Sequence, residues 1–114
     1  MNWYIAKIVF KINAGNASQK PQFDEHIRLI LADNFEEAFR KARIIGITEE
    51  DIIFRDTTKV AWEFVNVSEL YPLKELKDGT ELYSQINEEE EASTYIDHIH
   101  QRAAFMQIKA RPVF

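Results

Sequence analysis

The first segment of the chain alternates between two faces with a period of two residues. Over residues 3–12 the even positions are all apolar: Tyr4, Ala6, Ile8, Phe10 and Ile12. The odd positions form a mixed face: Trp3, Ile5, Lys7, Val9 and Lys11. Side chains of a β-strand point alternately to opposite sides, so this pattern predicts a strand whose even face lies in the core.

A second segment, residues 23–31, repeats the alternation. One face carries Phe23, Ile27, Leu29 and Leu31, and the other carries Asp24, His26, Arg28 and Ile30. The stretch between the two segments contains Gly15, Pro21 and small polar residues, which are typical of a loop. Because a parallel pair needs a longer crossover, we predict that the two strands pair antiparallel.

The period then changes to that of a helix. Apolar residues recur at helical spacing over residues 35–45: Phe35, Ala38, Phe39, Ala42 and Ile45. This stripe predicts an amphipathic helix. Asp33 is expected to cap its N-terminus, with Glu36 completing a capping-box-like pair, and Gly46 is expected to cap its C-terminus.

The region after this helix predicts a loop and then a third strand. Residues 48–59 are polar and irregular, which favours a loop or a short helical turn. In Val60–Val67, one face carries Val60, Trp62 and Phe64, and the other carries Ala61, Val65 and Val67. Because both faces are apolar, we expect a central strand that is covered on both sides. Asn66 interrupts the first face and could mark a β-bulge.

The last part of the chain predicts a short strand and a second helix. Pro72 is expected to end the pairing of the third strand. Asp78-Gly79 indicates a turn before a fourth strand over Thr80–Ile86. Residues 88–104 carry a modest helical stripe: Ala92, Tyr95, Ile96, Ile99 and Ala103.

These elements together predict an α+β fold. We expect an antiparallel sheet of about four strands packed on one main helix, in the order strand, strand, helix, strand, strand, helix. The core domain should span residues 1–86, and residues 87–114 should form a helical extension that packs on the core or on a neighbour. Phe39 and Trp62 lie at the centres of their apolar stripes, so we predict that they share one core.

Composition excludes several classes of function. The chain of 114 residues has the size of one domain and contains no cysteine, which rules out disulfides, thiolate metal ligands and a cysteine nucleophile. Its formal charge of −5 disfavours nucleic acid as a partner, because that affinity rests on Lys and Arg. We find no signal peptide and no apolar run of the roughly 20 residues that a membrane span needs. We therefore expect a soluble, cytoplasmic protein without a membrane partner.

Four stretches of the sequence carry a resemblance to a known family. Residues 3–10 read Trp-Tyr-Ile-Ala-Lys-Ile-Val-Phe, and a strand runs directly into a helix over residues 26–42. Residues 60–71 and the Asp-Gly-Thr-Glu-Leu-Tyr-Ser of residues 78–84 follow. In this order and spacing, the chain resembles the bacterial domain-of-unknown-function 4288 family over roughly residues 3–86. The resemblance supports the fold and implies no activity and no catalytic residue.

Histidines offer the main candidates for chemistry. His98 and His100 are two positions apart, which on a helix places them about 200° apart and prevents them from sharing an ion. We therefore predict no metal site and no cofactor. His26 could act as a general base with Asp24 as its orienting carboxylate, although neighbours at this spacing on a strand commonly only flank each other.

Two functions of different classes follow from these observations. The first is a non-enzymatic protein-interaction module, and the second is a small hydrolase or ligand-binding protein that uses His26 or the His98/His100 region. For either function, the binding residues that we single out are Trp3, Ile5, Val9, His26, Arg28 and Ile30.

We also predict a homodimer, formed through the second sheet face or through the C-terminal extension with its Phe105–Phe114 tail. An apolar patch is expected on the side of the sheet away from the main helix: Trp3, Ile5, Val9, Ile30, Val65 and Val67.

Overall fold

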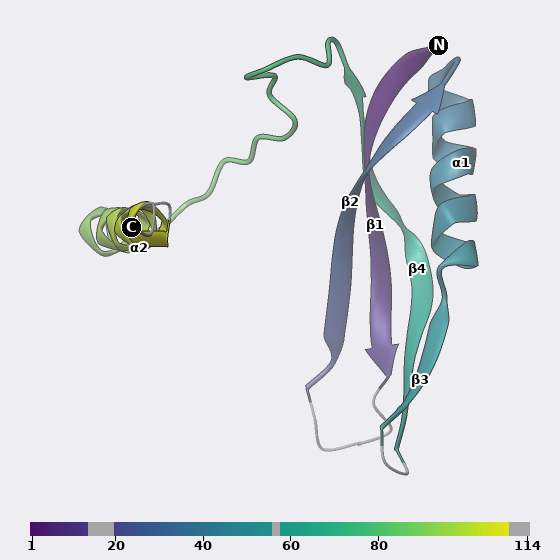
Figure 1. The fold of residues 1–114 in the computed structure, drawn as a ribbon, viewed down its shortest axis with the longest axis horizontal. Coiled ribbons are helices and arrows are strands. Elements are labelled where there is room, and N and C mark those ends of the chain that lie inside the picture. The colour runs from purple at the N-terminus through teal and green to yellow at the C-terminus, as the bar shows by residue number, and fades with distance from the viewer. Residues whose placement is uncertain (14–19, 56–57, 110–114) are drawn as a thin grey trace, which may run out of the picture. The chain divides into compact units, whose positions relative to one another are not determined.

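The computed structural model describes residues 1–13, 20–55 and 58–109, and it divides into two compact units (Figure 1). The first unit, Met1–Leu82, contains an antiparallel sheet and one helix. The second unit, Tyr83–Phe114, contains one helix, α2 (Ala92–Lys109). The predicted α+β fold is therefore confirmed, with the predicted order of strands and helices.

The sheet of the first unit has four strands in the spatial order β2-β1-β4-β3, and every neighbouring pair is antiparallel. Its elements along the chain are β1 (Asn2–Asn13), β2 (Gln22–Ala32), α1 (Phe35–Thr48), β3 (Asp51–Arg55) and β4 (Thr58–Leu73). β1 is an inner strand, hydrogen-bonded to β2 on one side and to β4 on the other. Figure 1 shows the three long strands crossing in a strong twist, with α1 along one side of them.

Three predictions about the strands were wrong. The region expected to be a loop contains β3, which pairs with the start of β4 from Asp51↔Trp62 to Arg55↔Thr58. The expected strand over Thr80–Ile86 is absent, since those residues form no regular element. β4 also continues through Pro72, which lies opposite Tyr4, because β1 is long enough to pair with it there.

The core lies between α1 and the even face of β1, as predicted. Tyr4, Ala6, Ile8 and Phe10 are all buried, and they form one cluster with Ile30, Ala32, Ala38 and Ala42. The residues that α1 buries are small: Ala38, Ala42 and Gly46. Small side chains let the helix backbone approach the sheet closely. The prediction for Phe39 was therefore wrong, since it is 37% exposed, whereas Trp62 is partly buried and packs on the core.

The ends of α1 differ from the sequence prediction by one to three positions. Asn34, not Asp33, is the N-cap, and its side-chain oxygen accepts a hydrogen bond of 2.8 Å from the Glu37 backbone N–H. The Glu37 carboxylate in turn accepts a hydrogen bond from the Asp33 backbone N–H, at 3.2 Å. Gly46 lies inside the helix, and Glu49 is the C-cap. The pair of Asn34 and Glu37 therefore resembles a capping box one residue later than predicted, with Glu37 bonding the residue before the N-cap.

Two irregularities in β4 change which way its side chains point. The register with β1 shifts between Lys7 and Ile8 and again between Val9 and Phe10, so one extra β4 residue is inserted at each place. Asn66 lies between these two shifts, in agreement with the predicted bulge. Val67 consequently lies opposite Ile8 and packs on the core, so the prediction that it faces away from the helix was wrong.

α2 is the helix of the second unit. Every residue of this helix is exposed, including the apolar residues Tyr95, Ile96, Ile99 and Met106. The helix at the end of the chain is confirmed, extending to Lys109. Among the described residues, neither helix is both long and apolar enough to span a membrane.

Candidate functional site

The side of the sheet opposite α1, here called the open face, is built from the odd positions of β1 and their neighbours. Trp3 lies between Leu31 and Leu73, and Ile5 lies between Leu29 and Tyr71. Five side chains on this face are between 42% and 56% exposed: Phe23, Ile27, Leu29, Val65 and Tyr71. The open face is therefore a broad apolar surface that extends over three strands.

The apolar surface is interrupted by one cluster of charges. Lys7, near the middle of β1, lies with its Nζ atom 3.5 Å from Glu25 Oε1 on β2 and 3.9 Å from Glu69 Oε2 on β4. The Lys7 side chain is half-buried, since only 23% of it is exposed. Charges held together across three strands lower the cost of placing a lysine in this apolar setting.

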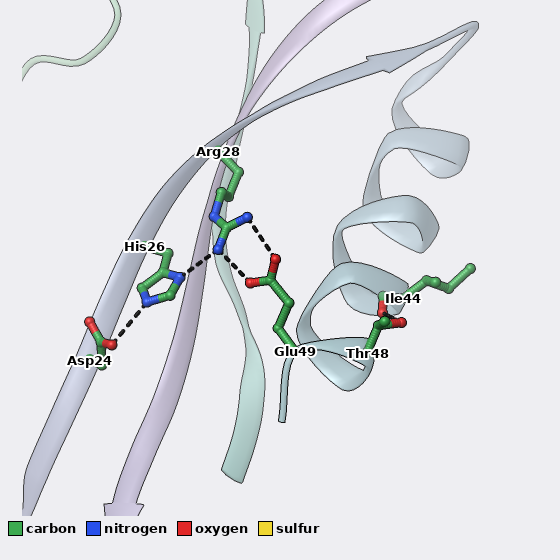
Figure 2. Close-up of polar contacts among 6 residues, drawn as sticks. All are labelled: Asp24, His26, Arg28, Ile44, Thr48 and Glu49. Carbon is green, nitrogen blue, oxygen red and sulfur yellow. Dashed lines mark hydrogen bonds and ion pairs between the residues drawn. The ribbon is translucent and has the colours of Figure 1, made fainter. Parts of the chain in front are cut away.

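The other side of β2 carries three polar residues that form a chain with Glu49 (Figure 2). Asp24 Oδ2 lies 2.9 Å from His26 Nε2, and Arg28 Nη2 lies 3.0 Å from His26 Nδ1. Arg28 also donates two hydrogen bonds to Glu49, the residue that caps the C-terminus of α1. The His26 ring packs against buried Phe10, with the ring centroids 4.9 Å apart. This chain ties the middle of β2 to the end of α1.

The hydrogen bonds determine the tautomer of neutral His26. A guanidinium group can only donate, so the Nδ1 atom facing Arg28 accepts and carries no proton. Nε2 then carries the proton, and its N–H donates a hydrogen bond to Asp24 Oδ2. Both ring nitrogens of His26 are thus engaged within the chain, and the arrangement positions the imidazole rather than presenting a basic nitrogen to a substrate.

The six residues singled out from the sequence fall on opposite sides of the sheet. Trp3, Ile5 and Val9 lie on the open face, where Ile5 is only 3% exposed. His26 and Arg28 lie on the α1 side, together with Ile30. The structure therefore does not bring these six residues into one site.

The placement of Ile30 on the face away from the helix was wrong. Ile30 lies opposite Tyr4, which faces α1, and it is only 2% exposed. This pairing turns Asp24, His26 and Arg28 toward the α1 side, and it turns the more apolar side of β2 outward.

Sequence reasoning missed Glu49 and the outward direction of Phe23, Ile27 and Leu29. Glu49 directly follows the helix, at a position that was assigned to a loop. For β2, the sequence does show that Asp24, His26 and Arg28 all lie on one side of the strand. Charged side chains can be covered only beside a group that pairs with them, and Glu49 pairs with Arg28.

The histidines of α2 do not converge. His98 and His100 are two positions apart on the exposed helix, so their side chains point in different directions. Within the described part of the chain, no group of three or more His, Asp or Glu side chains is arranged to hold a metal ion.

Comparison with known proteins identifies a family but no characterised relative. No curated protein and no solved structure matches the chain. The sequence pattern of the family described as Domain of unknown function (DUF4288) matches residues 3–84, which is most of the chain and nearly coincides with the Met1–Leu82 unit. The chain therefore belongs to the DUF4288 family.

Proposed function

We propose that this chain is a non-enzymatic protein-interaction module whose docking surface is the open face. The observation that carries the proposal is the direction of β2, which turns Phe23, Ile27 and Leu29 outward and Asp24, His26 and Arg28 toward α1. Monomers rarely leave a contiguous apolar surface of more than a few hundred Å² exposed. A strand that keeps its polar side partly covered and its apolar side more exposed is best explained by a partner on the apolar side.

The open face also suggests the chemistry of that partner. Its apolar residues would contact an apolar centre on the partner, as in the buried core of most protein interfaces. The Lys7–Glu25–Glu69 cluster lies within the same surface and would meet polar groups of the partner. This mixture favours a folded protein surface over a lipid or a small apolar ligand.

The alternative, a small hydrolase or ligand-binding protein, has weaker support. His26 has its two ring nitrogens facing Asp24 and Arg28, and Arg28 is held in turn by Glu49. A general base needs an unprotonated nitrogen that can reach the substrate. Nδ1 is the unprotonated nitrogen of neutral His26, and Arg28 occupies it.

Affinity capture with matched variants tests the proposal. Val65→Lys places a charge on the open face, and Ile44→Lys places the same charge on the exposed side of α1, where the wild-type side chain is 54% exposed compared with 51% for Val65. We expect a protein from the native host that wild type and Ile44→Lys retain equally and that Val65→Lys loses.

Two results would contradict the proposal. One is a set of captured proteins that is the same for Val65→Lys and wild type when both are folded by circular dichroism. The other is a hydrolytic activity that disappears in His26→Ala while Val65→Lys retains it, because that result would assign the function to the α1 side.

A further inference from the structure

The outer edge of β2 is a long and regular strand edge. β2 pairs with β1 in an unbroken register from Asn2↔Ala32 to Ile12↔Gln22, and no described strand pairs with its other side. Such an edge presents a row of backbone N–H and C=O groups that can pair with another strand. Chains commonly protect an edge with a bulge, a proline or a short strand. β2 carries charged residues, which also protect an edge, but it has neither a bulge nor a proline, whereas the opposite edge strand, β3, spans only Asp51–Arg55.

We propose that two copies of this chain pair antiparallel through their β2 edges, about a two-fold axis at His26, so that the two sheets continue into one. A two-fold axis requires a self-complementary surface, in which each residue of one copy meets its counterpart in reverse order. With the axis at His26, residue 24 lies opposite residue 28, and residue 23 lies opposite residue 29.

The side chains of β2 match in this register. Asp24 of each copy lies opposite Arg28 of the other, which joins opposite charges twice across the axis. Phe23 lies opposite Leu29 of the second copy, which joins an aromatic and an aliphatic side chain, also twice. Pairs of both kinds stabilise antiparallel strands. Both sets of side chains are accessible, because the Asp24 and Arg28 side chains are 39% and 35% exposed, and Phe23 and Leu29 are both exposed.

Other registers match less well. An axis at Glu25 or at Arg28 sets like charges directly opposite each other, which is destabilising. An axis at Ile27 sets the charged Asp24 against the apolar Ile30 of the second copy. In the same register Arg28 lies opposite His26, so no acidic side chain lies opposite a basic one. Among the axes at residues 25 to 28, the one at His26 alone sets Asp24 opposite Arg28, and we therefore favour it.

The proposed pairing has a consequence for the open face. A two-fold axis perpendicular to the sheet keeps both α1 helices on one side and both open faces on the other. The exposed Phe23 and Leu29 side chains of the two copies would meet there, and the two open faces would join into one larger surface. This inference goes beyond the proposed function, because edge pairing does not depend on what binds the open face.

Single cysteines test the register directly, since the natural chain contains none. Directly opposed residues in an antiparallel pair have Cα atoms about 4.5–5.5 Å apart, within the range of about 4.4–6.8 Å that a disulfide spans. Phe23→Cys and Leu29→Cys replace exposed side chains, so both variants should fold. We would mix the two variants under reducing conditions and then oxidise them.

We expect light scattering to give twice the 13.4 kDa mass of one chain for the wild-type protein. We also expect a cross-linked dimer in the Phe23→Cys and Leu29→Cys mixture, and at least fivefold less of it in either variant alone. Identical positions lie six residues apart along the paired strands, or about 20 Å, which is too far for a disulfide.

Two results would overturn the proposal. A mass of 13.4 kDa at every concentration up to 100 µM, about the highest needed for a weak dimer, would exclude edge pairing and leave the capture of a different protein by the open face intact. A dimer in which Val65→Cys cross-links to itself, while the Phe23→Cys and Leu29→Cys mixture does not, would show that the sheets meet face to face. Either result is distinguishable from failure of the proposed function, which would appear as the same captured proteins for Val65→Lys and wild type.

Discussion

The Phe64 ring of β4 occupies the space in which a side chain at Gly46 of α1 would lie. A Cβ atom built at Gly46 would come within 2.3 Å of Phe64 Cδ1 and 2.4 Å of Phe64 Cε1, which is far inside van der Waals contact. Gly46 therefore lies inside the helix because α1 passes directly over an aromatic ring. The absence of a side chain, rather than freedom of the backbone, explains this glycine.

Gly46→Ala should destabilise the fold through this contact. An added methyl group must displace the Phe64 ring, and overpacking of this kind costs about 1–3 kcal/mol, which outweighs the gain of about 1 kcal/mol that alanine normally gives over glycine in a helix. The net loss in the free energy of unfolding would be measured by urea denaturation. Ile47→Ala is the control on the exposed side of the same helix, where we expect a change within about 0.5 kcal/mol. A Gly46→Ala variant more stable than wild type would contradict the contact.

Two phenylalanines should respond very differently to truncation. Phe10 is 1% exposed at the centre of the core, so Phe10→Ala should cost about 3–5 kcal/mol. Phe39 lies on the exposed side of α1, so Phe39→Ala should cost only about 1 kcal/mol. Thermal and urea unfolding of the two variants would measure the difference. Equal losses of stability would mean that α1 packs through Phe39 rather than through its small residues.

The Arg28–Glu49 pair should contribute modestly to stability. The two side chains are 35% and 40% exposed, so solvent screens their attraction, and we expect a coupling of about 0.5–1 kcal/mol. A double-mutant cycle with Arg28→Met and Glu49→Gln would measure it, and 1 M salt, where the Debye length is about 3 Å, should reduce it. The exposed Lys77–Glu75 pair provides the control, with an expected coupling near zero. A coupling at Arg28–Glu49 that does not exceed the control value would mean that the pair does not hold β2 to α1.

The local sequence pattern predicted the helices and strands better than it predicted which side of each one is buried. The even face of β1 was assigned correctly because an inner strand that packs on a helix has a strict alternation, with Tyr4, Ala6, Ile8 and Phe10 all buried. The helix over 35–45 was also found, and the structure extends it to Thr48. Its buried stripe was misjudged, since hydrophobic periodicity gives weight to Phe39, whereas close packing on the sheet selects Ala38, Ala42 and Gly46.

The direction of the side chains on β2 and β4 depends on how these strands pair with β1. The sequence of one strand alone does not show that pairing. Ile30 faces α1 because it lies opposite Tyr4. Val67 faces α1 because the irregular register adds one residue to β4 between Asn66 and Phe64, which reverses the alternation. The polar chain from Asp24 to Glu49 was partly visible as His26 beside Asp24, but Glu49 comes from a distant part of the sequence.

The chain should purify without stoichiometric metal. His98 and His100 point in different directions on α2, and two imidazoles on separate sides of a helix cannot chelate one ion. Elemental analysis of protein prepared without a histidine tag would measure the metal content. Zinc, nickel or iron at one equivalent, lost in a His98→Ala/His100→Ala double variant, would contradict this prediction.

The direction of the β2 side chains is tested most directly by single cysteines at two adjacent positions. Leu29→Cys and Ile30→Cys would be labelled with a maleimide in dilute protein, and circular dichroism would confirm that both variants are folded. If β2 turns its apolar side outward, Leu29→Cys reacts at a rate close to that of a free thiol. Ile30→Cys should then react at least about tenfold more slowly, because it reacts only when the core opens. Fast labelling at Ile30→Cys together with protection at Leu29→Cys would contradict the outward apolar face, and with it the interaction surface.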